Sequence, residues 1–229
     1  VRVRAATRDE ADALRAQGLV VELVEQGGLF DAAQLPWAPE AVPHVFTTFR
    51  QGVERIGQQP PAPLPAPQAL PPWPEALPRP PLPGAGAVLP PGASDARSSF
   101  PYGLPAWPGD EAAALAHLQA YLASVRPHTY KATRNALTGR DFASHWSPWL
   151  ANGALSVRRV VAELRTFEAG RGASDGSYWL WFELLWREHF RWMLRRHGAV
   201  LFRPQGLLTS APRVVHDTDA FDRWREGRT

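Results

Sequence analysis

The chain has 229 residues, of which 45% are hydrophobic, so it can form one large domain or two small ones around a packed core. It has no cysteine, which excludes a disulfide framework and thiolate metal sites and suits the reducing cytoplasm. Its seven histidines show no metal-ligand spacing, and no apolar run of about twenty residues occurs. We therefore expect a cytoplasmic protein with neither a metal site nor a membrane span.

Positive charge is concentrated in the second half of the chain. Residues 1–120 hold 8 Arg or Lys and 12 Asp or Glu, whereas residues 121–229 hold 17 Arg or Lys and 10 Asp or Glu. A basic half of this kind can attract polyanions such as nucleic acid. It is also common in mildly basic domains that bind no nucleic acid, so charge alone leaves both interpretations open.

The first segment, residues 1–58, combines helix and strand signals. Residues 7–16 are predicted to form a helix, and the apolar run at residues 19–24 is predicted to form a buried strand. A second helix is predicted at residues 45–55, where apolar side chains recur at helical spacing: Val45, Phe49, Val53 and Ile56. One strand cannot make a sheet, so we interpret this segment as the C-terminal remnant of an α/β domain.

The second segment, residues 59–108, holds most of the 24 prolines of the chain. Its proline pairs exclude helix interiors and central strands. Such a composition favours an extended, semi-rigid linker between domains, although a polyproline ligand for another domain is an alternative.

The third segment, residues 109–229, is predicted to be helical. Asp110 is placed to cap a helix that reaches to about residue 125, and Ser156 is placed to cap a helix over residues 157–168. Ser177 is predicted to cap a long helix that continues through His197 and ends at Gly198.

The long helix carries charged and aromatic residues on one face. Glu183, Trp186 and Arg187 lie at positions i, i+3 and i+4, with Trp179 one turn earlier. The rest of the helix is apolar, which is typical of a buried helix, and buried charges need a partner or a ligand. Glu183 and Arg187 could form an intrahelical ion pair, or they could line a pocket for a polar ligand.

A second block has the residue types that an anionic ligand needs. Ser144, His145 and Ser147 precede or begin a helical turn that contains Pro148, where hydroxyl and backbone N–H groups can bind an anion. Simple helix capping by serine is the alternative. Tyr130 and Arg134, four residues apart, could present a phenol and a guanidinium together.

Both blocks resemble the photolyase/cryptochrome family. The flavin-binding helical domain of that family is similar to four motifs of this chain: Tyr130-x-x-Thr133-Arg134-Asn135, Ser144-x-x-Ser147-Pro148-x-Leu150, Gly153-x-Leu155-Ser156 and Glu183-Leu184-x-Trp186-Arg187. The DASH branch is similar to the earlier residues Leu35-Pro36-Trp37, Val45-Phe46-Thr47 and Pro63-Leu64-Pro65-Ala66-Pro67.

This resemblance implies a mainly α fold. Residues 109–229 would be the N-terminal half of the helical FAD-binding domain, after the Pro-rich linker and the small α/β remnant. Residues 224–229 match only the opening of a longer family motif. The chain is therefore expected to be a central fragment that lacks most of the antenna domain and the C-terminal half of the FAD domain, and to be inactive alone.

The resemblance also assigns roles to individual residues. Glu183 and Trp186 would be the catalytic residues, because they would face a pyrimidine dimer in DNA. Arg187 would lie between the flavin and the DNA, and Arg134 would contact a DNA phosphate. The FAD phosphates and ribityl chain would be lined by Tyr130, Ser144, His145, Trp146 and Ser147.

The function implied is that of a DNA photolyase, a carbon–carbon lyase that uses FAD and blue light to repair cyclobutane pyrimidine dimers. A DASH-type protein would act on dimer-containing single-stranded DNA as a monomer, with a folate antenna, methenyltetrahydrofolate, as a further cofactor of the full-length protein. Two departures favour a blue-light receptor without repair, or an inactive remnant: Ala143 replaces a hydroxyl residue, and Val214 stands where an electron-relay tryptophan is expected.

Overall fold

A computed structural model describes residues 2–21, 26–69, 72, 73, 75, 108–136, 141–213 and 216–228, with side chains from residue 9 onward. The described residues are mainly helical and include no strand, which confirms the mainly α class. They fall into two compact units. The first unit comprises described residues of Val1–Val24, Trp37–Phe49 and His189–Thr229, and the second comprises those of Glu25–Pro36 and Arg50–Glu188.

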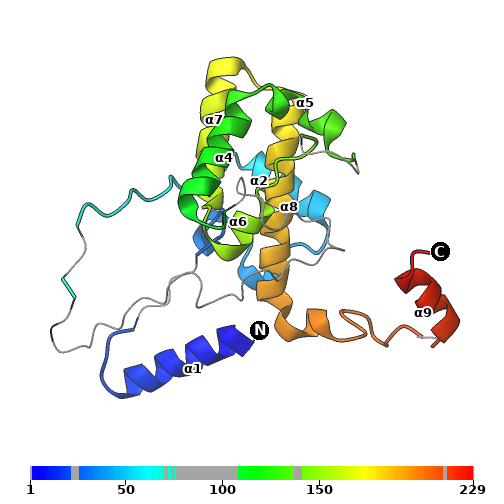
Figure 1. Cartoon of the computed structure of the whole chain (residues 1–229). Coiled ribbons are helices and arrows are strands. Elements are labelled where there is room, and N and C mark those ends of the chain that lie inside the picture. The colour runs from blue at the N-terminus through cyan, green and yellow to red at the C-terminus, as the bar shows by residue number, and fades with distance from the viewer. Residues whose placement is uncertain are drawn as a thin grey trace. The chain divides into compact units, whose positions relative to one another are not determined.

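The helices of the described residues differ widely in length (Figure 1). The α-helices are α1 (Arg2–Ala16), α2 (Phe46–Arg55), α4 (Glu111–Ala123), α5 (Arg126–Thr133), α6 (Ser147–Asn152), α7 (Val157–Arg171), α8 (Asp175–His197) and α9 (Thr218–Arg225). Short 3-10 helices are η1 (Ala32–Gln34), η2 (Pro39–Ala41) and η3 (Gly198–Phe202). No described helix is long and apolar enough to cross a membrane.

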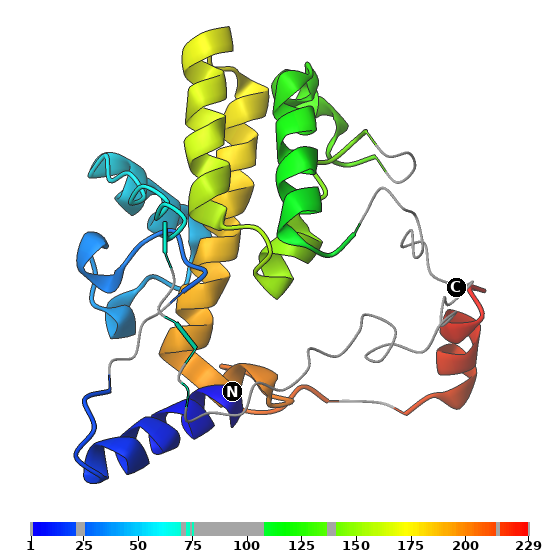
Figure 2. The same ribbon diagram turned by 60° about the vertical axis from the view of Figure 1, so that its left-hand side comes forward.

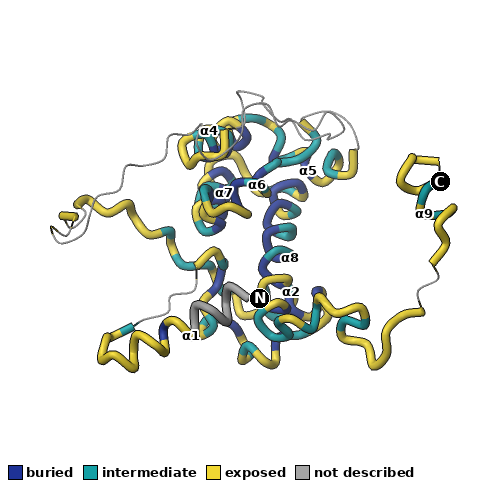
Figure 3. The backbone as a smooth tube through the Cα atoms, turned by 60° about the horizontal axis from the view of Figure 1, so that its bottom comes forward, coloured by how far each residue is buried: buried dark blue, intermediate teal, exposed yellow. Residues whose placement is uncertain are grey.

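The core of the second unit lies around α7 and the first part of α8. These two helices run side by side in opposite directions (Figure 2), and α4 packs against both α5 and α7. Buried positions follow α7 and α8 along their length (Figure 3). The core side chains are apolar or aromatic: Leu118, Tyr121, Trp149, Val160, Leu164, Leu180, Trp181, Leu184 and Leu185. This framework positions the loop before α6 and the C-terminal end of α5.

The first unit has a small core of its own. Phe46 and Phe49 of α2 both pack on the ring of His189, with centroids 5.8 and 5.2 Å apart. The Nε2 atom of His189 hydrogen-bonds the carbonyl oxygen of Pro43 at 2.9 Å. Arg196 donates to the carbonyl oxygen of Val42, which is fully buried. The last part of α8 is thereby joined to residues 42–49.

The predicted caps are confirmed in part. The Asp110 carboxylate accepts a hydrogen bond from the backbone N–H of Ala113 at 2.9 Å and begins α4. Ser156 begins α7, but its side chain makes no capping hydrogen bond. The cap of α8 was assigned wrongly, because Ser177 lies inside that helix. Ser174 is the capping residue: its hydroxyl accepts from Ser177 N–H, while the Ser177 hydroxyl accepts from Ser174 N–H.

The strand predicted at residues 19–24 is wrong over its described part. Residues 19–21 form neither helix nor strand, and Leu19 and Val20 are exposed rather than buried. A strand needs a neighbouring strand to pair its backbone groups, and none occurs in the described residues. Residues 22–24 lie outside the described residues, as does Val214.

The helix predicted at residues 45–55 is confirmed as α2. Of its four apolar positions, Phe49 and Val53 are buried, whereas Val45 and Ile56 are exposed. Residues 58–69 form neither helix nor strand, as expected for the Pro-rich segment. Most of the remaining linker lies outside the described residues, and the domain boundaries at residues 58 and 108 stay predictions.

Candidate functional site

Arg134 and Glu183, which come from different helices, form an ion pair. Arg134 is the C-cap residue of α5, and Glu183 lies on α8. The guanidinium carbon of Arg134 also lies 4.4 Å from the centre of the Trp179 ring, one turn before Glu183. The two charged side chains are 26% and 34% exposed, so the pair is at a half-open surface. The partner of Glu183 is thus Arg134, whereas an intrahelical pair with Arg187 was one of the two alternatives that the sequence left open.

Tyr130 lies beside this pair and is buried. Burial raises the pKa of its phenol, the negative charge of Glu183 raises it further, and Arg134 acts in the opposite direction. Burial also raises the pKa of Tyr121, and Tyr130 adds to that effect. Both phenols are therefore neutral at physiological pH and can donate hydrogen bonds.

Trp146 connects this region to the loop before α6. Its ring meets Tyr121 edge-on, with centroids 5.2 Å apart, and the residue is only 3% exposed. Within the described part of the chain, its buried indole N–H has no hydrogen-bond partner. Buried donors are normally satisfied, so an unpaired one suggests a missing acceptor. Trp146 was predicted to line the FAD site.

The other residues of this block adopt an irregular loop. The backbone oxygen of Ser144 accepts a hydrogen bond from His117 Nε2 at 2.8 Å. His145 has a left-handed φ of 54°, and its ring packs edge-on against Phe142 with centroids 5.1 Å apart. Ser147 is the first residue of α6 and is exposed. Ser144 and His145 therefore lie in the loop and Ser147 at the start of α6, while their role in anion binding stays a prediction.

Arg187 and Trp186 lie further along α8. Arg187 donates to the carbonyl oxygens of Gly27 at 2.8 Å and Leu150 at 3.3 Å. It thus joins α8 to α6 and to the backbone of Gly27. Trp186 is half-buried. Arg187 therefore has a clear structural role, and its predicted place between flavin and DNA stays a prediction.

The sequence interpretation missed Glu188, a carboxylate that is only 1% exposed. Glu188 accepts hydrogen bonds from the backbone N–H groups of Leu29 at 2.8 Å and Phe30 at 3.3 Å. Arg158 of α7 binds the same loop through the carbonyl oxygens of Gly28 and Leu29, at 3.2 and 3.1 Å. A signal existed, because Glu188 follows Leu184 and Leu185 at helical spacing and so lies on the buried face.

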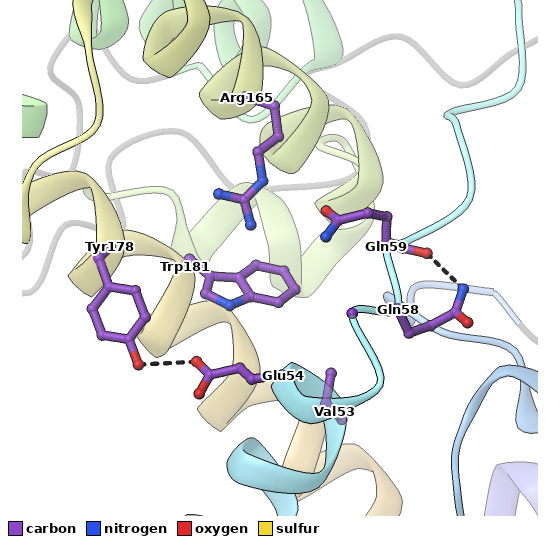
Figure 4. Close-up of a pocket in the computed structure, with 8 residues that line it drawn as sticks. Val53, Glu54, Gln58, Gln59, Arg165, Tyr178 and Trp181 are labelled. Carbon is purple, nitrogen blue, oxygen red and sulfur yellow. Dashed lines mark hydrogen bonds between the residues drawn. The ribbon is translucent and has the colours of Figure 1, made fainter.

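A pocket of about 250 Å³ lies between the end of α2 and helices α7 and α8 (Figure 4). Glu54 accepts from the hydroxyl of Tyr178 at 2.9 Å and is paired with Arg50. Arg165 lies 5.0 Å from the centre of the Trp181 ring and is paired with Glu168 at 2.6 Å. The charged groups of the pocket are therefore already paired, and the pocket includes none of the predicted site residues. The described residues contain no cluster that could hold a metal ion.

Known proteins are similar to this chain in both sequence and fold. It is 38% identical to cryptochrome DASH of Vibrio parahaemolyticus over 202 residues, 88% of this chain and 42% of that protein. It is 40% identical to cryptochrome DASH of Gloeobacter violaceus over 198 residues, 85% of this chain and 38% of that protein. The solved structure of a Synechocystis sp. PCC6803 cryptochrome matches with a TM-score of 0.71 and 32% identity, covering 96% of this chain and 45% of that one. The chain belongs to the DASH branch of the photolyase/cryptochrome family.

This membership confirms the family predicted from the sequence motifs. No protein-family model matches the chain. The DASH-type chain spans less than half the length of the relatives reported above. The roles of individual residues, the cofactor and the substrate are therefore taken up as proposals.

Stability should fall when the pH drops below the ordinary histidine pKa of 6.5. Burial lowers the pKa of His117 despite its bond to Ser144, and burial lowers the pKa of His189 despite its bond to Pro43. Below pH 6.5 the unfolded chain therefore binds more protons than the folded chain. The contribution of these two neutral histidines to the stability is complete above this pH and is lost as the pH falls. Thermal unfolding followed between about pH 7.5 and pH 5.5 should show a falling midpoint.

The variant His117→Gln separates this cause from general acid denaturation. Glutamine can still donate to the Ser144 carbonyl but does not titrate, so the variant should lose part of the pH dependence. A midpoint that falls equally in the variant and in the unchanged chain would assign the effect to other groups.

Proposed function

We propose that this DASH-type chain is part of a protein that binds FAD and uses blue light to repair cyclobutane pyrimidine dimers in single-stranded DNA. The observation that carries the proposal is the cluster of Arg134, Glu183 and Trp179 beside the buried phenol of Tyr130. It offers a guanidinium, a carboxylate and an aromatic face at a half-open surface. These are the groups that bind phosphates, base edges and unstacked bases.

The residues predicted to hold FAD fit such a ligand. The buried indole N–H of Trp146 lacks an acceptor among the described residues, and Tyr130 is neutral and able to donate. Ser144, His145 and Ser147 would add hydroxyl and backbone donors for the phosphates and ribityl chain. Bound reduced FAD would supply, on absorbing blue light, the electron that splits the dimer.

On the DNA side, each residue would have a separate task. Arg134 would hold a backbone phosphate, Glu183 would accept hydrogen bonds from the bases of the dimer, and Trp186 would pack against them. Arg187 would separate the flavin from the DNA. Single-stranded DNA suits such a site because its bases are already unpaired, which lowers the cost of flipping the dimer. We expect a monomer that works in the cytoplasm, with a folate antenna in the full-length protein.

The proposal is tested by an absorption spectrum of the purified chain after incubation with FAD. We expect the flavin bands to stay with the protein during gel filtration, and the reduced, illuminated complex to remove dimers from single-stranded oligothymidylate. A chain that stays colourless would contradict the proposed cofactor. Bound flavin with persistent dimers would instead favour a blue-light receptor.

The variant Trp146→Phe tests the cofactor site without any activity measurement. It keeps an aromatic ring but removes the buried N–H, so FAD binding should weaken about threefold to tenfold if this group donates to the ligand. Isothermal titration of FAD gives the dissociation constant directly. Equal affinity of the variant and the unchanged chain would remove Trp146 from the site, and the midpoint of unfolding shows whether the variant is folded.

A further inference from the structure

The proposed function assigns Arg134 and Glu183 two separate contacts with DNA, yet the structure pairs them with each other. A guanidinium paired with a carboxylate is largely neutralised, so it attracts a phosphate less strongly than a free one. A carboxylate held by a guanidinium likewise has fewer oxygen lone pairs available for bases. While this pair is closed, neither Arg134 nor Glu183 can make its strongest contact with DNA.

The surroundings of the pair favour the closed arrangement but leave it able to open. Trp179 holds the guanidinium of Arg134 from one side at 4.4 Å, and it lies on the same helix face as Glu183. Because both charged side chains are about a third exposed or less, solvent and a second anion can still reach them. A phosphate of a DNA strand can therefore compete with Glu183 for the same guanidinium.

We propose that Arg134 and Glu183 form a latch that is closed in the free protein and opened by single-stranded DNA. This inference rests on the proposed function. A phosphate of the strand takes Arg134, and the released carboxylate of Glu183 then becomes free to accept hydrogen bonds from the bases of a dimer. Arg134 is in this view a positioning residue, which holds Glu183 in place and offsets its negative charge until a strand arrives.

The latch makes a prediction that independent contacts do not make. If closing the pair lowers the population of the binding-competent state, removing the carboxylate of Glu183 should raise the affinity for DNA. The gain should need Arg134, because it comes from freeing that guanidinium. Two independent residues would give effects that add, whereas a latch gives effects that depend on each other.

The experiment measures binding of a fluorescein-labelled, undamaged oligothymidylate by fluorescence anisotropy. Undamaged DNA has no dimer for Glu183 to contact, so only the latch is tested. Glu183→Gln should tighten binding about fivefold, and Arg134→Gln should weaken it by a similar factor. In the double variant the Glu183→Gln gain should shrink to less than about twofold. Circular dichroism of all four proteins establishes that they are folded.

Glu163→Gln is the matched control for the loss of one negative charge. Glu163 is paired with Arg159 on α7 at 2.7 Å and is 30% exposed, close to the exposure of Glu183. This control should leave the affinity unchanged. Tighter binding by Glu183→Gln that persists in the Arg134→Gln background, or that also occurs in Glu163→Gln, would overturn the latch but leave the proposed function standing. If none of the four proteins binds the oligonucleotide, the proposed function and the latch both fail.

Discussion

Replacing Gly176 by alanine should destabilise the protein by about 3 kcal/mol. Gly176 is buried near the start of α8, where it crosses α5. A Cβ atom there would lie 2.2 Å from the carbonyl oxygen of His128 and 2.3 Å from that of Pro127. These are backbone atoms that no rotamer change can move, so the two helices must separate. A thermal scan should show a midpoint roughly 6–12 °C lower.

The crossing at Gly176 also holds the candidate site together. Around it, His128 hydrogen-bonds the Ser174 hydroxyl at 2.9 Å and Lys131 pairs with Asp175 at 2.8 Å. Separation of the helices would therefore pull Tyr130 of α5 and the C-cap residue Arg134 away from Glu183. We expect the variant to lose any DNA affinity together with its stability.

Gly170→Ala is the control for this prediction. Gly170 lies in the last turn of α7, and a Cβ there would meet nothing within 4 Å. Alanine is the better helix former, so this variant should be stabilised by about 0.5–1 kcal/mol. If Gly176→Ala unfolds at the same temperature as Gly170→Ala, the close approach of α5 and α8 is not a property of the protein.

Replacing Glu188 by alanine should cost about 3 kcal/mol of the free energy of unfolding. The change leaves the backbone N–H groups of Leu29 and Phe30 without their acceptor, and both residues are almost fully buried. A buried donor without an acceptor loses its hydration without compensation. Urea denaturation gives the loss in free energy, and hydrogen exchange should show faster exchange of these two amides.

Two variants show whether the loss arises from these hydrogen bonds. Glu188→Gln keeps one acceptor oxygen of similar shape, so its loss should lie between those of the unchanged chain and Glu188→Ala. Glu163→Ala removes a carboxylate that is only paired with Arg159 on the helix surface, and it should cost about 0.3–0.5 kcal/mol. Equal losses for Glu188→Ala and Glu163→Ala would contradict the structural role of Glu188.

Local sequence signals predicted helices well where the signal and the stabilising contact lie close together in the chain. Asp110 begins α4 because its carboxylate needs only the N–H group three residues later. The same rule misplaced the start of α8 by one turn, since Ser174 and Ser177 cap each other and either serine matches the pattern. The apolar run at residues 19–24 misled the prediction because a strand depends on a distant partner.

For the candidate site, the sequence predicted which residues lie in it but not which of them contact one another, and their roles stay predictions. Helical spacing and family motifs predicted Tyr130, Arg134 and Glu183, and the resemblance to the family added Trp146. The chain does belong to that family. One of the two alternatives paired Glu183 with Arg187 on its own helix, because only neighbours along one helix can be read from spacing. Its observed partner is Arg134, 49 residues earlier, which a helix crossing brings into reach.

Family, helical class and the residue types of the site therefore follow from the amino-acid order, since helix periodicity and motifs are local properties of a chain. The pairing of Arg134 with Glu183, the burial of Glu188 beneath residues 29 and 30, and the need for glycine at position 176 follow only from the packing of α5, α7 and α8. Each depends on groups that lie far apart in the sequence, and their distances are set by how whole helices fit together.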